Sequence, residues 1–253
     1  MENLKNLLVA IDTSSSENAI AYALAMAKDT GSHLTIVLCY DPSDPNAKEK
    51  VREGFEHMKA QLLQDASVPH RLVSSDRPVI QTLTETTSVY HPDVLLTVLP
   101  EEAVLEQLIE KTRWPTLVVP PKVSYQKIHD IAVAYDSLAL SEMAPFSFIN
   151  QLARHYRAFV HILELDHNAS FTDRYNSRTN WEVDYLLKDV KHQFHFIKNG
   201  NVTAGIRKFL TRRAADLLVV LSRRQVPGDE YPLDRHTIKI AHHIPKPLMI
   251  FKV

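Results

Sequence analysis

The sequence contains the same apolar run, closed by a carboxylate, in each of its halves. Residues 6–12 read NLLVAID and end in Asp12, and residues 130–136 read DIAVAYD and end in Asp136. The offset between the two carboxylates is 136 − 12 = 124, about half of the 253 residues. A pattern that returns after half the chain length predicts that one folding unit has been duplicated.

A second pair of segments repeats at almost the same spacing. HPDVLLTVLP (91–100) is echoed by AADLLVVLS (214–222), which aligns Asp93 with Asp216. Their offset is 216 − 93 = 123, one residue less than the first offset. Two matching offsets in the same order favour a tandem repeat of one α/β unit.

Apolar runs alternate with helical periodicity along both halves. A continuous apolar run is typical of a central parallel strand covered on both faces, and apolar residues three or four apart predict an amphipathic helix. In the first half we expect strands at 7–11, 34–39, 70–75, 94–99 and 116–120, and helices with apolar stripes at 19–27, 51–62, 78–90 and 104–112. In the second half we expect strands at 131–135, 159–165, 193–198, 217–222 and 248–253, and helices near 140–156, 173–190, 203–214 and 235–244.

Strands that alternate with helices imply parallel crossovers, which are almost always right-handed. We therefore predict an α/β protein with two tandem doubly wound, Rossmann-like domains, residues 1–122 and 126–253. Each should contain a five-stranded, mostly parallel sheet with helices on both faces. The segment PPKVS (120–124) is interpreted as the linker, because its two prolines prevent further strand pairing.

The charge balance argues against a general nucleic-acid binder. The chain has 29 Lys and Arg against 30 Asp and Glu, a net charge of −1, so no positive excess is available to neutralise a phosphate backbone. The amino-terminal apolar run is too short for a signal peptide, and no stretch approaches the ~20 apolar residues that cross a bilayer. The single cysteine, Cys39, is expected in a buried strand. We expect a cytoplasmic protein without a membrane partner.

The 13 histidines do not form a metal-ligand pattern. His192 and His195 lie in an expected strand at an odd spacing, so they should point to opposite faces of the sheet. No cysteine cluster or Glu-bearing histidine pair suggests zinc, and we expect no metal site. Trp114 and Trp181 are interpreted as packing anchors.

Several segments together resemble the universal stress protein family. They are the two strand–Asp openings, the Ala-rich first helix, NGNVTAGIRKFLTRRAADLLVVLS (199–222) and the ending HIPKPLMIFK (243–252). The first half ends similarly, in EKTRWPTLVVP (110–120). The resemblance covers nearly the whole chain as two tandem domains of that family.

Nucleotide-binding members of that family carry a Gly-x-x-Gly segment and a later Gly-Ser or Gly-Thr after the fourth strand. Glycines let backbone N–H groups approach phosphate oxygens, and the following helix N-terminus adds a favourable dipole. The first half of this chain runs TVLPEEAVLEQLIEK (97–111) without a glycine, and Glu101 and Glu102 would repel phosphate. The second half keeps a loop, SRRQVPGDEYPLDRHT (222–237), with Gly228 alone. These departures predict degenerate nucleotide sites.

Certain side chains at strand ends are nevertheless candidates for a nucleotide site. The candidates are Asp12, Thr13, Asp136, Ser137, Arg223 and Arg224. In the resembling family the acidic residue at this strand end helps hold adenosine, and open α/β sheets bind ligands at the carboxyl ends of their strands. Alternatively, each aspartate caps the following helix together with its hydroxyl neighbour. The two arginines could bind phosphate bidentately, or they form a solvated pair at the start of a loop.

Two functions from different classes remain open. The missing glycines favour a non-catalytic, universal stress protein-like module of stress response or signalling, which needs no cofactor and works through a protein partner or self-association. The strand-end carboxylates and the retained loop favour an adenine-nucleotide (ATP or AMP) binding protein that uses the second domain, and this interpretation leaves a slow ATP hydrolysis open. An unrelated small-molecule binder using the same crevice is a third interpretation, because a fold does not dictate a function.

The resemblance also implies how the chain is assembled. In the family the last strand of each domain pairs across a two-fold axis. TLVVP (116–120) and LMIFKV (248–253) are therefore expected to cover each other's edges in an intramolecular pseudo-dimer. A further homodimer of this chain stays open.

Overall fold

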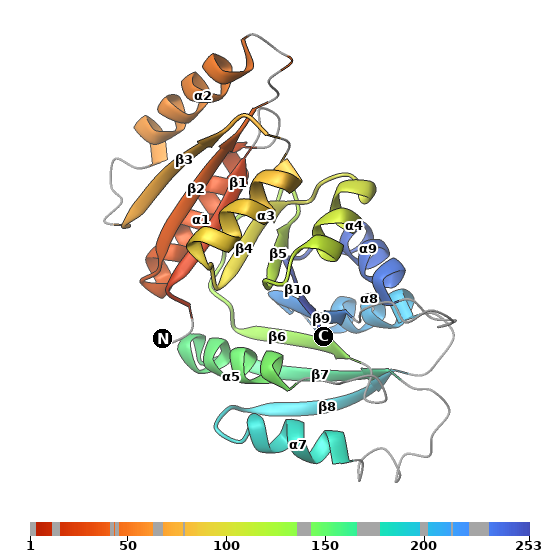
Figure 1. The fold of residues 1–253 in the computed structure, drawn as a ribbon. Helices are drawn as coiled ribbons and strands as arrows, with labels where there is room; N and C mark the ends of the chain where they lie inside the picture. Colours follow the sequence, from red (N-terminus) through yellow and green to blue (C-terminus); the bar gives the residue numbers. More distant parts are fainter. Residues whose placement is uncertain are drawn as a thin grey trace. The chain divides into compact units, whose positions relative to one another are not determined.

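The computed structural model contains two units of the same design, residues 2–125 and residues 126–253 (Figure 1). It describes residues 4–11, 16–40, 43, 46–62, 68–77, 79–135, 143–165, 178–197, 202–213, 215–222 and 233–253. Each unit contains five parallel strands and its own helices. Among the described residues no helix is long and apolar enough to cross a membrane.

The strands of the first unit lie in the order β3-β2-β1-β4-β5, and all neighbouring pairs run parallel. The strands are β1 (Asn6–Ile11), β2 (His33–Cys39), β3 (His70–Ser75), β4 (Val94–Val98) and β5 (Thr116–Val119). The helices are α1 (Ser16–Thr30), α2 (Ala47–Leu62), α3 (Val79–Tyr90) and α4 (Glu102–Lys111). The chain moves outward from β1 to β3 and then returns to the other side of β1, which is the doubly wound topology.

The second unit repeats this order as β8-β7-β6-β9-β10, again with parallel neighbours. Its strands are β6 (Asp130–Tyr135), β7 (Phe159–Leu165), β8 (His192–Ile197), β9 (Leu217–Ser222) and β10 (Leu248–Lys252). Its helices are α5 (Ala144–Tyr156), α7 (Arg178–Leu186), α8 (Val202–Arg212) and α9 (Leu233–His243). The predicted fold class, two tandem doubly wound domains with five-stranded parallel sheets, is confirmed.

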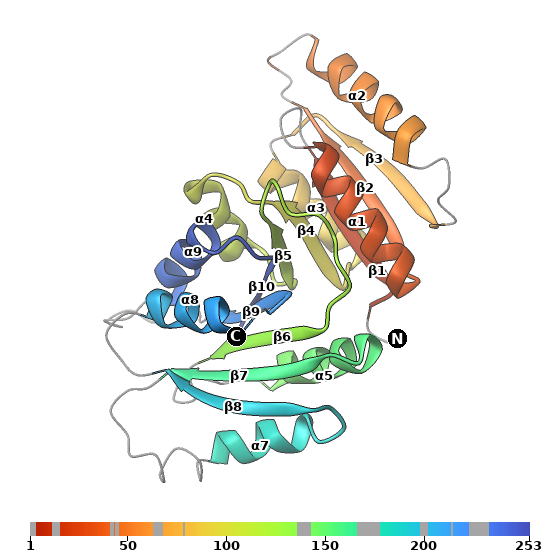
Figure 2. The same ribbon diagram turned by 180° about the vertical axis from the view of Figure 1, so that it is seen from behind.

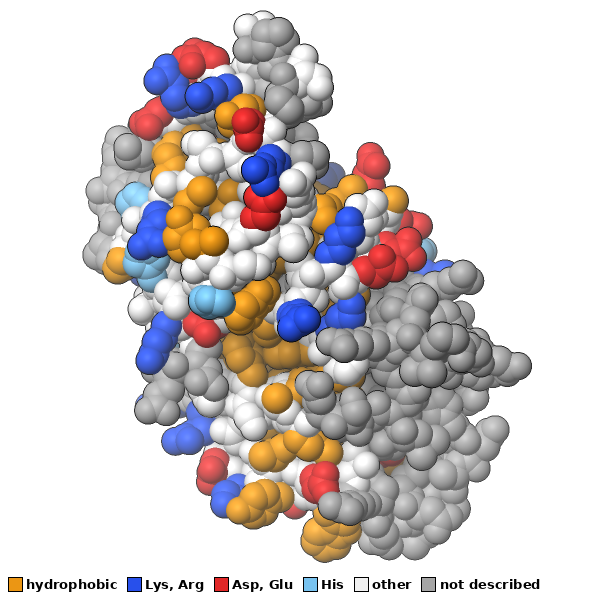
Figure 3. All heavy atoms as spheres, viewed as in Figure 1, with side chains coloured by type: hydrophobic (Ala, Val, Ile, Leu, Met, Phe, Trp, Pro, Cys, Tyr) orange, Lys and Arg blue, Asp and Glu red, His pale blue; other side chains and the backbone are white. Residues whose placement is uncertain are grey.

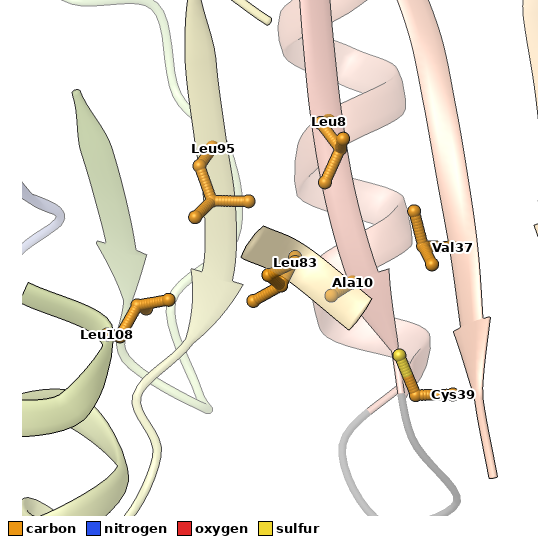
Figure 4. Close-up of a cluster of buried hydrophobic side chains, with 7 residues drawn as sticks. All are labelled: Leu8, Ala10, Val37, Cys39, Leu83, Leu95 and Leu108. Carbon is orange, nitrogen blue, oxygen red and sulfur yellow. The ribbon is translucent and has the colours of Figure 1, made fainter. Parts of the chain in front are cut away.

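Both faces of the first sheet are covered at β1, since residues 7–11 are all buried although successive side chains of a strand point to opposite faces. Leu8 and Ala10 belong to a buried cluster that also contains Leu83 of α3 and Leu95 of β4. Figure 4 shows Leu83 next to these strand residues, with α1 behind β1. The same cluster holds Cys39, which is buried in β2 as the sequence predicts.

The connection after β5 packs back on the first unit (Figure 2). Asn18 of α1 donates from Nδ2 to the carbonyl of Pro120 at 3.2 Å. The hydroxyl of Tyr125 donates to Asp29 at the end of α1 at 2.6 Å, and its ring packs edge-on against Tyr22 at 5.2 Å. The segment that follows β5 is thus fastened along one helix instead of extending the sheet.

A carboxylate at the start of the fourth strand joins that strand to the first strand of its unit. In the first unit, Oδ2 of Asp93 accepts the backbone N–H groups of Lys5 at 2.7 Å and Asn6 at 2.8 Å. The backbone N–H of Asp93 in turn donates to the carbonyl of Asn6 at 2.9 Å. These contacts connect residues far apart in sequence and set the register of β1 against β4.

The second unit builds the same joint from the residue that the repeat aligned with Asp93. Oδ2 of Asp216 accepts the backbone N–H groups of His129 at 2.7 Å and Asp130 at 3.1 Å. The backbone N–H of Asp216 donates to the carbonyl of Asp130 at 2.9 Å. The duplicated aspartates therefore have a duplicated structural role, and we call each arrangement the strand joint.

Replacing either joint aspartate by alanine should destabilise the protein. Asp93→Ala and Asp216→Ala each leave two backbone N–H groups without their carboxylate, which costs about 1–3 kcal/mol of the free energy of unfolding. Urea denaturation followed by circular dichroism measures this change. The exposed Asp189 serves as the control, since Asp189→Ala should change stability by less than about 0.5 kcal/mol. Equal effects of Asp93→Ala and Asp189→Ala would refute the role of the joint.

Candidate functional site

The candidate site of each unit lies where its first and fourth strands end. β1 pairs with β2 on one side and β4 on the other, and β6 pairs likewise with β7 and β9. The order of strands reverses at these central strands, and open α/β sheets bind ligands at such a switch point, beyond the carboxyl ends of the strands. The six residues predicted from sequence, Asp12, Thr13, Asp136, Ser137, Arg223 and Arg224, fall in this region of the chain but outside the described residues.

In the first unit the connection between β4 and α4 is very short. β4 ends at Val98 and α4 begins at Glu102, so residues 99–101 make the whole turn. Glu101 precedes the helix with φ −57° and ψ 153°, and its side chain makes no capping hydrogen bond. The expectation that the strand passes almost directly into the helix is confirmed.

Backbone hydrogen bonds and two carboxylates mark the start of α4. The carbonyl of Glu101 accepts the N–H groups of Val104 at 3.0 Å and Leu105 at 2.9 Å. The carboxylates of Glu101 and Glu102 are both on exposed residues of this helix start. Acidic side chains complement the positive end of the helix dipole, the role that a bound phosphate would otherwise have.

In the second unit the corresponding connection is longer. β9 ends at Ser222, which is fully buried, and α9 begins at Leu233, so residues 223–232 separate them. This segment contains Gly228 and the two candidate arginines. The two units thus differ most in length where the family's phosphate loop would lie.

A buried polar chain distinguishes the carboxyl edge of the second sheet. Tyr135, the last residue of β6, donates its hydroxyl to Oδ1 of Asn180. Nδ2 of Asn180 donates to Oε2 of Glu164 at 3.0 Å. All three residues are buried, with Glu164 only 2% exposed. Asn180 lies in the first turn of α7, so the chain ties that helix to two strands of the sheet.

The first unit has apolar residues at the equivalent strand positions. Tyr135 is paired in register with Glu164, and the corresponding pair in the first unit is Ile11 with Leu38. Ile11 and Leu38 are both buried. This polar chain was not predicted from the sequence. The acidic residue near the end of the apolar run FVHILEL was its one visible signal.

Solved structures with similar folds span this chain almost completely. A universal stress protein from Archaeoglobus fulgidus DSM 4304 matches with a TM-score of 0.71 and 12% identity, over 98% of this chain and 96% of its own. A putative universal stress protein from Pseudomonas aeruginosa UCBPP-PA14 matches with a TM-score of 0.68 and 15% identity, over 98% of this chain and 93% of its own. The chain has the fold of these full-length universal stress proteins. The resemblance stated from sequence is thereby confirmed at the level of the fold.

A third structure of this fold gives no functional description. It is a functionally unknown protein from Pseudomonas aeruginosa PAO1, with a TM-score of 0.66 and 15% identity over 98% of this chain and 92% of its own. No protein-family model matches the sequence, and no curated protein matches it at a significant level. The universal stress protein fold is thus carried here by a sequence that retains little of the relatives' residue identity.

Two other predictions about side chains have different outcomes. His192 and His195 do point to opposite faces, since His192 contacts Asp184 of α7 at 2.9 Å and His195 packs against Phe209 of α8. Within the described ranges no cluster of three or more His, Cys, Asp or Glu could hold a metal ion. The interpretation of Trp181 as a packing anchor is wrong, because this side chain is 63% exposed.

The surface carries a small aromatic feature and mixed charge. Trp181 and Tyr185 lie four residues apart on α7, and both are exposed. On the face shown in Figure 3, hydrophobic side chains reach the surface in the region of α7 and in other places, with basic and acidic side chains interspersed among them. Lys188 covers the ring of Tyr185 at 4.6 Å, a cation–π contact that reduces the apolar area open to a partner.

Removing only the middle residue of the polar chain should lower the free energy of unfolding more than replacing all three residues. Asn180→Leu deprives both Tyr135 and Glu164 of a buried partner, and we expect a loss of about 1–3 kcal/mol in the free energy of unfolding. The triple variant Asn180→Leu, Tyr135→Ile, Glu164→Leu copies the apolar pair of the first unit and should recover most of this loss. Thermal and urea denaturation compare the variants. A triple variant less stable than Asn180→Leu would show that the chain is not a self-contained polar unit.

Proposed function

We propose that the chain is a universal stress protein-like module of stress response or signalling that works without catalysis and with degenerate nucleotide sites. The observation that carries this proposal is the three-residue connection, 99–101, between β4 and α4. A phosphate cradle needs a run of backbone N–H groups presented by a flexible loop. A turn this short, without glycine, supplies no such run.

Local electrostatics support the same conclusion for the first unit. A triphosphate at the start of α4 would face the carboxylates of Glu101 and Glu102, and like charges a few ångströms apart repel each other. The amides of Val104 and Leu105 already donate to the carbonyl of Glu101. Both the geometry and the charge therefore oppose nucleotide binding there.

A module of this kind would act through contacts with a protein partner or with itself. The proposed intramolecular pseudo-dimer would present two related but unequal units. A signal would change the contacts that these units make with the partner or with each other. The balanced net charge of −1 suits a protein partner better than a nucleic acid. We place this activity in the cytoplasm.

One specific feature favours the alternative function, adenine-nucleotide binding by the second unit. Residues 223–232 are long enough to wrap around a phosphate group, and Arg223 and Arg224 begin this segment directly after buried Ser222. Asp136 follows β6 at the position that holds adenosine in the resembling family. Guanidinium groups could replace missing backbone donors.

Nucleotide titration separates the two functions. We expect that mass spectrometry detects no nucleotide released from freshly purified protein. Isothermal titration calorimetry with ATP or AMP should show no saturable binding up to about 1 mM ligand, which means a binding free energy weaker than about −4 kcal/mol. We also expect no ATP hydrolysis above the buffer rate. Saturable binding in the micromolar range would overturn the proposal and establish the alternative.

The duplicated carboxylates provide a matched control for any binding that is seen. Under the alternative function, Asp136→Ala should weaken nucleotide binding, whereas Asp12→Ala, the same change in the other unit, should leave it unchanged. Equal losses in both variants would place nucleotide in both units and would contradict the argument from the short connection.

A further inference from the structure

A second polar chain crosses the other face of the second sheet, away from the carboxyl edge. Nε2 of His161 on β7 lies 3.1 Å from Oδ1 of Asp130 on β6. Nδ1 of the same imidazole lies 3.1 Å from Nε2 of His195 on β8. Both contacts are hydrogen bonds when each imidazole is neutral and carries its proton on Nε2, because His195 then donates to His161 and His161 donates to Asp130. We call this arrangement the histidine chain.

Helix α8 covers the histidine chain. The ring of Phe209 on α8 packs 5.5 Å from His161 and 4.9 Å from His195. The helix approaches the sheet closely, because a Cβ placed on Gly205 would meet Cγ2 of Ile197 on β8 at 2.3 Å. The His161 side chain is only 4% exposed. Two titratable rings thus form part of the apolar contact between α8 and the sheet.

Burial is the main cause that opposes protonation of the histidine chain, and the surrounding charges act in both directions. Burial lowers the pKa of His161 against the opposing pull of the Asp130 carboxylate, and the positive charge of Arg213 lowers it further. Burial also lowers the pKa of His195 to about 4, with smaller contributions from His161 and Arg213. Behind Asp130, Asp216 accepts its backbone N–H group at 3.1 Å as part of the strand joint.

The first unit has no titratable group at the corresponding positions. Strand register aligns Asp130 with Asn6, His161 with Thr35 and His195 with Val73. The helix that precedes β4, as α8 precedes β9, is α3. Acid sensitivity at this contact would therefore belong to the second unit, with α3 as an internal reference.

We propose that the Asp130–His161–His195 chain makes the docking of α8 on its sheet sensitive to acid. At neutral pH the two imidazoles are uncharged, satisfy each other and pack against Phe209. Protonation of both rings removes the acceptor on His161 Nδ1 and sets two positive charges beside each other under the helix. The contact then favours an opened state in which α8 leaves the sheet and the rings become hydrated.

The direction follows from linkage between protonation and opening. Since both pKa values are lowered in the closed state, the opened state binds more protons below its ordinary histidine pKa of about 6.5. Closure is fully favoured above that pH and is lost as pH falls toward about 4. Each bound proton changes the ratio of closed to opened molecules by about tenfold per pH unit in this window.

Hydrogen exchange with mass spectrometry tests this proposal on the full chain. After correction for the intrinsic pH dependence of exchange, peptides from α8 should lose protection at least about tenfold relative to peptides from α3 between pH 6.5 and 4.5. His195→Gln keeps an N–H donor without a titratable ring and should remove most of this loss. His192→Gln, on the same strand but facing α7, should retain it. Unchanged protection of α8, or equal behaviour of the two variants, would overturn the proposal.

A measurement on the unsubstituted protein keeps the test independent of how the variants fold. Nitrogen-15 NMR of histidine-labelled protein should show His161 and His195 neutral and protonated on Nε2 at neutral pH. Titration of both rings near the ordinary histidine pKa of about 6.5 would contradict the histidine chain as the acid-sensitive element.

Discussion

Each unit depends on a carboxylate that satisfies two backbone N–H groups at the start of its central strand. Asp93 is 87 residues from Asn6 in the sequence, and Asp216 is 86 residues from Asp130. Each carboxylate nevertheless accepts a hydrogen bond directly from the backbone N–H of that distant residue. Unpaired backbone donors at a strand start would cost free energy, and a charged acceptor removes that cost more effectively than a neutral one. The joint fixes the first strand against the fourth, and with them the switch point where a ligand would bind.

The strand joint lies at the opposite end of the strands from the carboxyl edge. The residues at the carboxyl edge can therefore differ between the units while the pairing of the first strand with the fourth is kept. The first unit has apolar Ile11 and Leu38 at its edge and only residues 99–101 after its fourth strand. The second has the Tyr135–Asn180–Glu164 chain and a longer connection. The same scaffold thus carries two chemically different edges.

The elements could be predicted from sequence because continuous apolar runs mark buried parallel strands. The strands at 70–75, 159–165 and 217–222 have the predicted bounds. The repeat also aligned Asp93 with Asp216, but their bonds to the first strand depend on strand pairing, which a local pattern does not contain. Trp181 was misjudged because the sequence shows that a helix is amphipathic more readily than it shows which residues face the core.

The site was less predictable because its side chains come from distant segments. Asn180 joins Tyr135 and Glu164 only after α7 packs on the sheet. His161 and His195 become neighbours through the pairing of β7 with β8, whereas sequence reasoning compared His195 with nearby His192. Two histidines at same-facing positions of adjacent expected strands were the signal available. The six residues chosen from sequence, at the ends of strands, fall outside the described part of the chain.

The most direct test of the proposal that the first unit holds no phosphate is a crystal structure of the chain grown with excess ATP and Mg²⁺. We expect residues 99–101 to retain their short turn and the start of α4 to hold no nucleotide. Electron density for a triphosphate against the first amides of α4, beside Glu101 and Glu102, would contradict the proposal.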